Sequence, residues 1–338
     1  MSSPPNDENG RVIAAAFALL QSLPPSFQAG PYAIPHVHKM VEAVERAIPE
    51  RLPCTSPRGV ATKKRRLLSP RSDSLSQPTD SGLTLQFPIQ RIALPSLEAF
   101  HREYMLTDTP VIITGAMASW PAMGLDDPSR SWQEISYFRR VAGHRTVPIE
   151  VGSSYLEDDW GQQLMTMNEF IDRFLEPSAA DQEDDRPIGY LAQHHLFEQI
   201  PALRKDIMTP DYCTLQRDAV AEEEDDDITV NAWFGPQNTV SPLHFDPKDN
   251  LLCQAVGSKY LRLYAPSESD KLYPVEGLLS NTSQVDVEHA DPLKFPLFQA
   301  APYTECVLHA GEMLFIPRRY WHFVRSLSTS FSVSFWWS

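Results

Sequence analysis

From about residue 228 to the C-terminus, the chain repeats short apolar segments separated by turn residues. The segments are rich in β-branched and aromatic residues, and the turns contain Gly, Pro, Asn and Ser. In Ser330–Trp336 polar and apolar residues alternate with a period of two, which predicts a strand that buries one face. Many short strands with regular turns indicate a sandwich or barrel, of which the jelly roll is the double-sheet form. We expect strands at Ile228–Phe234, Leu251–Val256, Lys259–Tyr264, Glu305–Leu308, Met313–Ile316 and Ser330–Trp336.

Turns and an insertion separate these strands. Gly257-Ser258 and Ala310-Gly311 lie where tight turns are needed, and residues 267–302 are too long for a simple hairpin loop. Further upstream we expect strands at Phe87–Ile92 and Pro110–Gly115, with a helix over Ser96–Met105 between them. At least two more helical stretches are expected between residues 132 and 174.

The first 84 residues have a different composition. Residues 1–50 are predicted to be helical, with helices over Arg11–Ser22 and His36–Ile48, and residues 51–84 are predicted to be a disordered basic linker. Within the linker, Lys63–Arg66 is followed by Ser69-Pro70. This motif fits a nuclear localisation signal beside a phosphorylation site, and it equally fits a solvated basic patch. Residues 85–338 form the expected globular domain, with the barrel over about 228–338 and acidic surface loops at 181–185 and 222–227.

Charge and composition narrow the class of partner. The net charge is −15, divided between +3 for residues 1–80 and −18 for the rest. An acidic domain binds nucleic-acid backbone poorly and favours encounter with basic peptides or proteins.

The sequence contains no run of 18 or more apolar residues, so no membrane span is expected. The N-terminus lacks the pattern of a secretory signal. The four cysteines form no Cys-x-x-Cys pair, so reduced structural thiols in an intracellular protein are expected.

Ser241-Pro-Leu-His244-Phe-Asp246, with His322 far downstream, is a candidate metal site. Residues two apart on a strand point to the same face, so His244 and Asp246 can reach one ion. Two imidazoles and a carboxylate suit Fe(II), Mn(II) or Zn(II), and no thiolate is nearby to select zinc. Such a facial triad leaves coordination positions open for a co-substrate and O₂. A single His-x-Asp pattern also occurs by chance.

Lys259 lies on the expected strand after this motif. A lysine facing the interior of a barrel requires an anionic partner, which a ligand carboxylate would supply. Ser241 and Asn250 can donate hydrogen bonds to the same ligand. From the residues alone, an ordinary surface lysine is the alternative.

Taken together, these motifs resemble the JmjC domain, the double-stranded β-helix of Fe(II)/2-oxoglutarate oxygenases. The resemblance covers roughly residues 85–338. The segments that carry it are 145–155, 189–197, 231–250, 257–266, 281–288, 311–325 and 330–338. It implies a mainly β fold with flanking helices, a cupin-like jelly roll preceded by a helical, partly disordered N-terminal region.

The resemblance also implies roles for individual residues. His244, Asp246 and His322 would be the catalytic Fe(II) ligands, with 2-oxoglutarate and O₂ as co-substrates. Lys259 would pair with the distal carboxylate of 2-oxoglutarate. The remaining roles would be 2-oxoglutarate binding by Tyr190, Trp233, Ser241 and Asn250, and substrate binding by Glu150 and Trp233.

The same family suggests several activities. We favour hydroxylation of an arginine side chain at C3 in a protein substrate, because the carboxylate of Glu150 can form a bidentate pair with a guanidinium. Demethylation of dimethyl-lysine, of the histone H3 lysine 36 type, is the alternative. A non-catalytic chromatin or transcription cofactor and a histone-tail peptidase stay open. The expected partner is a basic protein or peptide that presents Arg or methyl-Lys, and histones are among the candidates. Neither direct nucleic-acid binding nor membrane binding is expected, and the expected location is the nucleus, with the cytoplasm also open.

Overall fold

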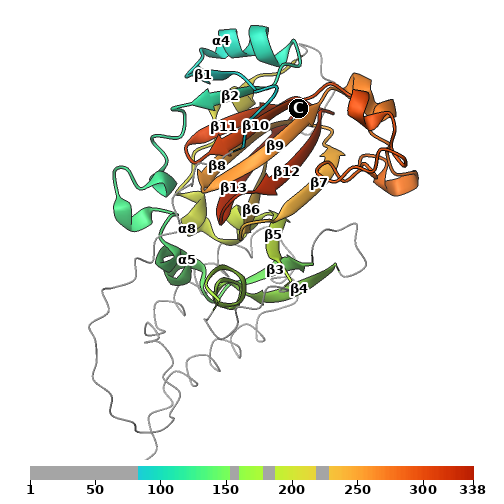
Figure 1. Ribbon diagram of the computed structural model, residues 1–338. Coiled ribbons are helices and arrows are strands. Elements are labelled where there is room, and N and C mark those ends of the chain that lie inside the picture. The colour runs from blue at the N-terminus through green and yellow to red at the C-terminus, as the bar shows by residue number, and fades with distance from the viewer. Residues whose placement is uncertain (1–82, 153–159, 178–186, 218–227) are drawn as a thin grey trace, which may run out of the picture. The chain divides into compact units, whose positions relative to one another are not determined.

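The computed structural model describes residues 83–152, 160–177, 187–217 and 228–338. The two helices expected before residue 50, the linker with Lys63–Arg66 and both acidic loops lie outside the described residues. The strands of the described chain form two β-sheets, which confirms the predicted cupin-like jelly roll (Figure 1). None of the described helices is long and apolar enough to cross a membrane.

The larger sheet has nine strands and the smaller one has four. Neighbouring strands are antiparallel except for the parallel pair β1–β2. In spatial order the large sheet consists of β1 (Arg91–Ala93), β2 (Val111–Thr114), β11 (Glu312–Ile316), β8 (Asp249–Val256), β13 (Ser330–Trp337), β6 (Thr229–Gly235), β5 (Gly189–His194), β3 (Thr146–Val151) and β4 (Gly161–Thr166). The small sheet consists of β10 (Thr304–His309), β9 (Ser258–Tyr264), β12 (Trp321–Ser326) and β7 (Val240–Phe245).

Two glycines form the corners at which the chain passes from one sheet to the other. Gly257 joins β8 to β9 with φ of 71°, and Gly311 precedes β11 after β10 with φ of 90°. Both angles lie in the left-handed region, which glycine adopts without steric cost. The tight turns predicted at these positions are confirmed.

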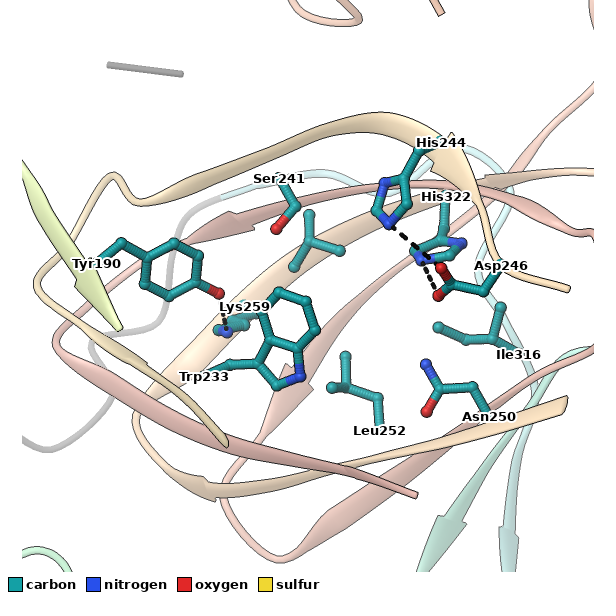
Figure 2. A pocket seen from close by; sticks show the side chains of 11 residues that line it. Tyr190, Trp233, Ser241, His244, Asp246, Asn250, Leu252, Lys259, Ile316 and His322 are labelled. Carbon is teal, nitrogen blue, oxygen red and sulfur yellow. Dashed lines mark hydrogen bonds and ion pairs between the residues drawn. The ribbon is translucent and has the colours of Figure 1, made fainter. Parts of the chain in front are cut away.

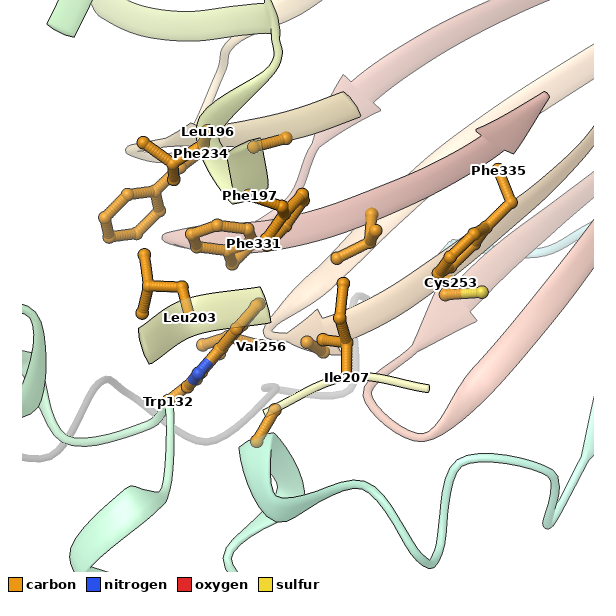
Figure 3. Close-up of a cluster of buried hydrophobic side chains, with 14 of the residues drawn as sticks. Trp132, Leu196, Phe197, Leu203, Ile207, Phe234, Cys253, Val256, Phe331 and Phe335 are labelled. Atoms are coloured by element: carbon orange, nitrogen blue, oxygen red, sulfur yellow. The ribbon is translucent and has the colours of Figure 1, made fainter. Parts of the chain in front are cut away.

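The large sheet buries both of its faces. On its outer face Phe331, Val333 and Phe335 of β13 pack with Trp132 and Phe138 in an aromatic core. Figure 3 shows Phe331, Phe335 and Trp132 in this cluster. Burial of each such side chain contributes about 1.5–3 kcal/mol. The serines of β13 face the other way, into the space between the sheets, and are equally buried. The prediction that this strand buries one face is therefore incomplete, because side-chain hydrogen bonds such as Ser332 Oγ to Gln254 Oε1 (2.7 Å) satisfy the polar face.

The helices follow the predicted pattern. Ser96 caps α4 (Leu97–Phe100) by accepting a hydrogen bond from the Ala99 amide, and α4 continues into the π-helical η1 (His101–Met105). The two later helices are α5 (Ile135–Ala142) and α6 (Met167–Phe170), the latter extended by η4 (Ile171–Leu175). Shorter helical turns are η2 (Pro121–Met123), η3 (Pro128–Arg130), α7 (Leu196–Gln199), α8 (Pro201–Arg204) and η6 (Asp211–Thr214).

The insertion has its own core. It contains η7 (Pro266–Lys271), η8 (Gly277–Leu279) and η9 (Phe298–Ala300), and its apolar side chains pack against the small sheet. Residues 281–283 pair with β7: the Ser283 amide donates to the Leu243 carbonyl at 2.8 Å, and the Phe245 amide donates to the Asn281 carbonyl at 2.9 Å. The insertion thus covers an edge strand that would otherwise leave backbone groups unpaired. Cys213, Cys253 and Cys306 are buried free thiols, as predicted for these three.

Candidate metal centre and anion pocket

One pocket lies between the two sheets and brings together most of the predicted site residues (Figure 2). Strands β5, β6, β8 and β11 of the large sheet form one wall, and β7, β9 and β12 of the small sheet form the other. The lining residues are Tyr190, Trp233, Ser241, His244, Asp246, Asn250, Leu252, Lys259, Ile316, His322 and Val324.

His244, Asp246 and His322 meet at one end of the pocket. In the β7–β12 register His322 lies directly opposite His244, and the two ring centroids are 4.3 Å apart. The Asp246 oxygens lie 4.0 Å from His244 Nε2 and 3.6 Å from His322 Nε2. One ligand atom from each residue falls within 4.8 Å of the others, a spacing compatible with a single ion. The expectation that both motif residues belong to one strand needs correction, because β7 ends at Phe245 and Asp246 follows it.

Hydrogen bonds orient both imidazoles for metal binding. His244 Nδ1 lies 2.7 Å from the Pro242 carbonyl and His322 Nδ1 lies 2.9 Å from the Tyr320 carbonyl. A carbonyl only accepts, so each Nδ1 carries the proton and each Nε2 presents its lone pair toward Asp246. Burial, and then the neighbouring His244, lower the pKa of His322 to about 4, which keeps this imidazole neutral.

A buried ion pair holds the loop around Asp246. Arg217 donates from Nε and Nη2 to the two carboxylate oxygens of Asp249, both at 2.6 Å. Asp249 also accepts from the Arg318 amide at 2.8 Å, and the Arg319 amide donates to the Asp246 carbonyl at 2.7 Å. This ion pair could not be predicted from the sequence, because no local spacing links position 217 to position 249.

Lys259 stands at the other end of the pocket. Its side chain is 1% exposed, and Nζ donates to the Tyr190 hydroxyl at 3.2 Å. Within the described ranges no carboxylate lies within 4.0 Å of this ammonium group. Burial lowers its pKa to about 7. The alternative of a surface lysine is therefore wrong, and the ammonium group is placed to bind an anion that enters the pocket.

Other polar groups point into the same space (Figure 2). The Asn250 side chain is buried, and its Oδ1 has no hydrogen-bond partner among the described residues. Its Nδ2 is the atom that can donate a hydrogen bond to a carboxylate ligand. Trp233 donates from Nε1 to Ser334 Oγ at 2.9 Å, which fixes its ring near Tyr190, with ring centroids 6.2 Å apart. Burial raises the pKa of Tyr190, so its hydroxyl stays protonated and can donate.

Three apolar residues complete the pocket and were not predicted. Leu252 lies two residues after Asn250, and Val324 lies two residues after His322. Because alternate residues of a strand share a face, the period-two rule could have found both. No sequence signal identifies Ile316.

Glu150 lies beside the pocket and is not one of its lining residues. In the β3–β5 register it is opposite Tyr190, so the two side chains share one face of the sheet. Trp160 Nε1 donates to its carboxylate at 3.4 Å. Burial raises the pKa of Glu150 and the hydrogen bond from Trp160 opposes that shift.

A two-sheet barrel with a His-Asp-His cluster and a buried lysine defines the class of cupin-like oxygenases. Residues 97–338 match the family described as Cupin-like domain, and the chain belongs to this family in its JmjC form. These enzymes use Fe(II), 2-oxoglutarate and O₂. The triad and the Lys259 pocket fit the first two by ligand type and by position.

Among individual relatives, lysine-specific demethylase 8 of Danio rerio is 53% identical over 251 residues, covering 74% of this chain and 58% of the relative. Lysine-specific demethylase JMJ30 of Arabidopsis thaliana is 47% identical over 72% of this chain and 53% of its own length. Jumonji C domain-containing protein 5 of Drosophila melanogaster is 43% identical over 75% of this chain and 61% of its own length. The chain spans little more than half the length of these relatives. The predicted resemblance is confirmed.

Proposed function

We propose that this protein is an Fe(II)- and 2-oxoglutarate-dependent oxygenase that oxidises a basic side chain of a protein substrate. The observation that carries the proposal is the pairing, in one pocket, of a His-Asp-His cluster with a buried lysine that has no carboxylate partner. The iron would supply the oxidative chemistry, coupled to decarboxylation of 2-oxoglutarate.

The chain's own residues would bind and orient the reactants. His244, Asp246 and His322 would hold the ion with half of its coordination sphere open. Lys259 and the Tyr190 hydroxyl would bind the distal carboxylate of 2-oxoglutarate, with Ser241 and Asn250 as further hydrogen-bonding partners. The apolar side chains of Leu252, Ile316 and Val324 would exclude water from the co-substrate.

For the reaction itself, the comparisons favour demethylation of methylated lysine, because two of the relatives reported above are named lysine-specific demethylases. This reverses our sequence-based preference for arginine hydroxylation. Oxidation of an N-methyl carbon gives a product that releases formaldehyde, whereas oxidation of a side-chain methylene leaves a stable hydroxyl.

Arginine hydroxylation is the second candidate, and Glu150 favours it. A carboxylate beside the pocket can accept two parallel hydrogen bonds from a guanidinium. A dimethylammonium group has one N–H and is bound better by aromatic rings. Among the pocket-lining residues the aromatic rings are Tyr190 and Trp233, and both already donate hydrogen bonds or accept them within the protein.

The first experiment measures succinate release from 2-oxoglutarate in the presence of Fe(II), with and without basic peptides. We expect turnover that Asp246→Ala abolishes, whereas Asp270→Ala, in η7 outside the pocket, leaves it unchanged. Equal turnover by the Asp246 variant would contradict the proposal.

The second experiment separates the two reactions. Methyl-lysine peptides that release formaldehyde would support demethylation, and arginine peptides that gain one oxygen atom by mass spectrometry would support hydroxylation. Glu150→Gln keeps the size of the side chain and removes its charge. We expect it to raise the KM for arginine peptides about tenfold and to change that for methyl-lysine peptides little.

A nuclear location is also proposed, supported by the Lys63–Arg66 motif. A fluorescent fusion is expected to leave the nucleus when these four residues are replaced by alanine. An unchanged distribution would leave the motif as a solvated basic patch.

A further inference from the structure

The pocket wall continues beyond the barrel as an open ledge. In the β3–β4 register Glu150 is opposite Gln162 and Pro148 is opposite Leu164. Opposed residues share a face, and Glu150 shares its face with Tyr190, which lines the pocket. We call this surface the β3–β4 ledge; it comprises Pro148, Glu150, Trp160, Gln162 and Leu164.

The opposite face of the same hairpin packs on the core through three of its residues, although Gln163 on that face is exposed. Val147, Ile149 and Met165 are buried in the large hydrophobic cluster. Leu164, by contrast, is 75% exposed and Trp160 is 37% exposed. No described element covers the ledge, although its face is continuous with that of Tyr190 and Trp233.

The ledge combines apolar contact area with one carboxylate. Glu150 is its only ionisable residue, and the hydrogen bond from Trp160 Nε1 holds the indole beside that carboxylate. An apolar surface next to a single negative charge fits a polypeptide that is basic at one position and apolar at another.

We propose that the β3–β4 ledge binds an extended stretch of a basic protein substrate and selects an apolar side chain near the residue that enters the pocket. This inference rests on the proposed function for the identity of the target residue. Neighbouring strands are about 4.8 Å apart, and Leu164 is also offset from Tyr190 by two residues along the strands, so the two residues lie about 12 Å apart. An extended chain advances about 3.3 Å per residue, which places the apolar side chain about three to four residues from the target.

The test uses peptides with a fixed arginine or dimethyl-lysine and either leucine or aspartate at each position from two to four residues away, on both sides. We expect leucine three to four residues away to raise kcat/KM several-fold over aspartate, chiefly through a lower KM. Leu164→Ser should remove this preference. It should leave 2-oxoglutarate turnover without peptide unchanged, because Leu164 lies outside the pocket.

The matched control is Leu293→Ser, which removes another highly exposed leucine (92% exposed) from the insertion. This variant should keep the preference. The proposal would be overturned if the preference for leucine persisted in the Leu164→Ser variant, or if leucine had no effect at any position.

Binding of the same peptides, followed by fluorescence anisotropy, separates the two proposals. If neither peptide class is oxidised, the proposed function fails. In that case the proposed role of the ledge still requires the leucine peptides to bind the unmodified protein more tightly than the Leu164→Ser variant. Equal binding to the two proteins would overturn that role.

Discussion

At the scale of single residues, Lys259 is the most informative side chain. A buried ammonium group with no carboxylate partner in the described chain costs stability, because burial removes its hydration. A single hydrogen bond to the Tyr190 hydroxyl compensates only part of that cost. A ligand carboxylate would compensate the rest, so the free energy that is lost in folding becomes available for binding.

Lys259→Met should separate binding from stability. Methionine keeps an unbranched apolar chain and removes the charge, so the Kd for 2-oxoglutarate is expected to rise about 10- to 100-fold. The ligand-free protein should become no less stable, since the variant no longer buries an uncompensated charge. Isothermal titration calorimetry and thermal unfolding measure the two effects.

Lys294→Met provides the control for that substitution, because Lys294 is exposed on the insertion. It should change neither property. A Lys259 variant that binds 2-oxoglutarate normally would rule out the role assigned to this residue.

The pH dependence of binding follows from the same group. The pKa of Lys259 is about 7 in the ligand-free protein and 10.5 is its ordinary value, so the ammonium form is lost as the pH rises through 7. Affinity for 2-oxoglutarate should therefore fall up to tenfold per pH unit above about 7. Between pH 7 and 10.5 the unfolded chain binds more protons at this site, so its contribution to stability rises with pH. Opposite pH trends of affinity and stability, both absent in Lys259→Met, are the expected result.

At the scale of elements, the sequence pattern identified strands with uniform apolar or alternating composition and missed the others. The strands for which no range was predicted are β3, β4, β5, β7 and β12, although a strand was expected at His244 in β7. β7 contains Pro242 and ends at the metal ligands, and β4 is an edge strand with the polar sequence GQQLMT. Proline and polar residues are tolerated there because edge strands and strand ends need fewer hydrogen bonds and less burial.

The candidate site was predicted more fully than the strands that carry it. Motif spacing and family resemblance named eight of the pocket-lining residues, because ligand chemistry restricts residue type. His244 and His322 lie opposite each other because of the pairing register between β7 and β12. These strands are far apart in the sequence, and no local pattern encodes their register. The Arg217–Asp249 pair was missed for the same reason.

The glycine corners give a prediction at this scale. A Cβ at Gly257 would lie 2.1 Å from the Thr329 carbonyl oxygen, in addition to the strain of a positive φ. Gly257→Ala should therefore lower the free energy of unfolding by more than about 2 kcal/mol. At Gly311 the nearest atom would be Met123 Cε at 3.7 Å, so Gly311→Ala should cost only the backbone strain of about 1–2 kcal/mol.

Gly161→Ala is the control for both glycine variants, since a Cβ there meets nothing within 4 Å and its φ is ordinary. Urea unfolding should rank the variants as Gly161, Gly311 and Gly257 in order of increasing loss. Equal stabilities for the three alanine variants would show that the corners do not depend on glycine.

At the scale of the whole molecule, the charge distribution bears on encounter with substrate. The part of the chain after residue 80, which contains the pocket, carries a net charge of −18. Within about 10 Å, the Debye length at 0.1 M salt, an acidic surface attracts basic peptides, and added salt screens that attraction.

Salt should therefore weaken the binding of basic peptide substrates and have less effect on the binding of 2-oxoglutarate. Raising the salt concentration from 0.05 to 0.5 M is expected to raise the KM for a peptide of net charge about +4 several-fold, because the Debye length shortens from about 14 to 4 Å. The KM for 2-oxoglutarate should change less, since its proposed partner Lys259 is buried and poorly screened. A peptide with the same target residue and no net charge is the control. If both peptides respond equally to salt, the acidic surface has no part in substrate encounter, and recognition rests on contacts at the pocket and its surroundings.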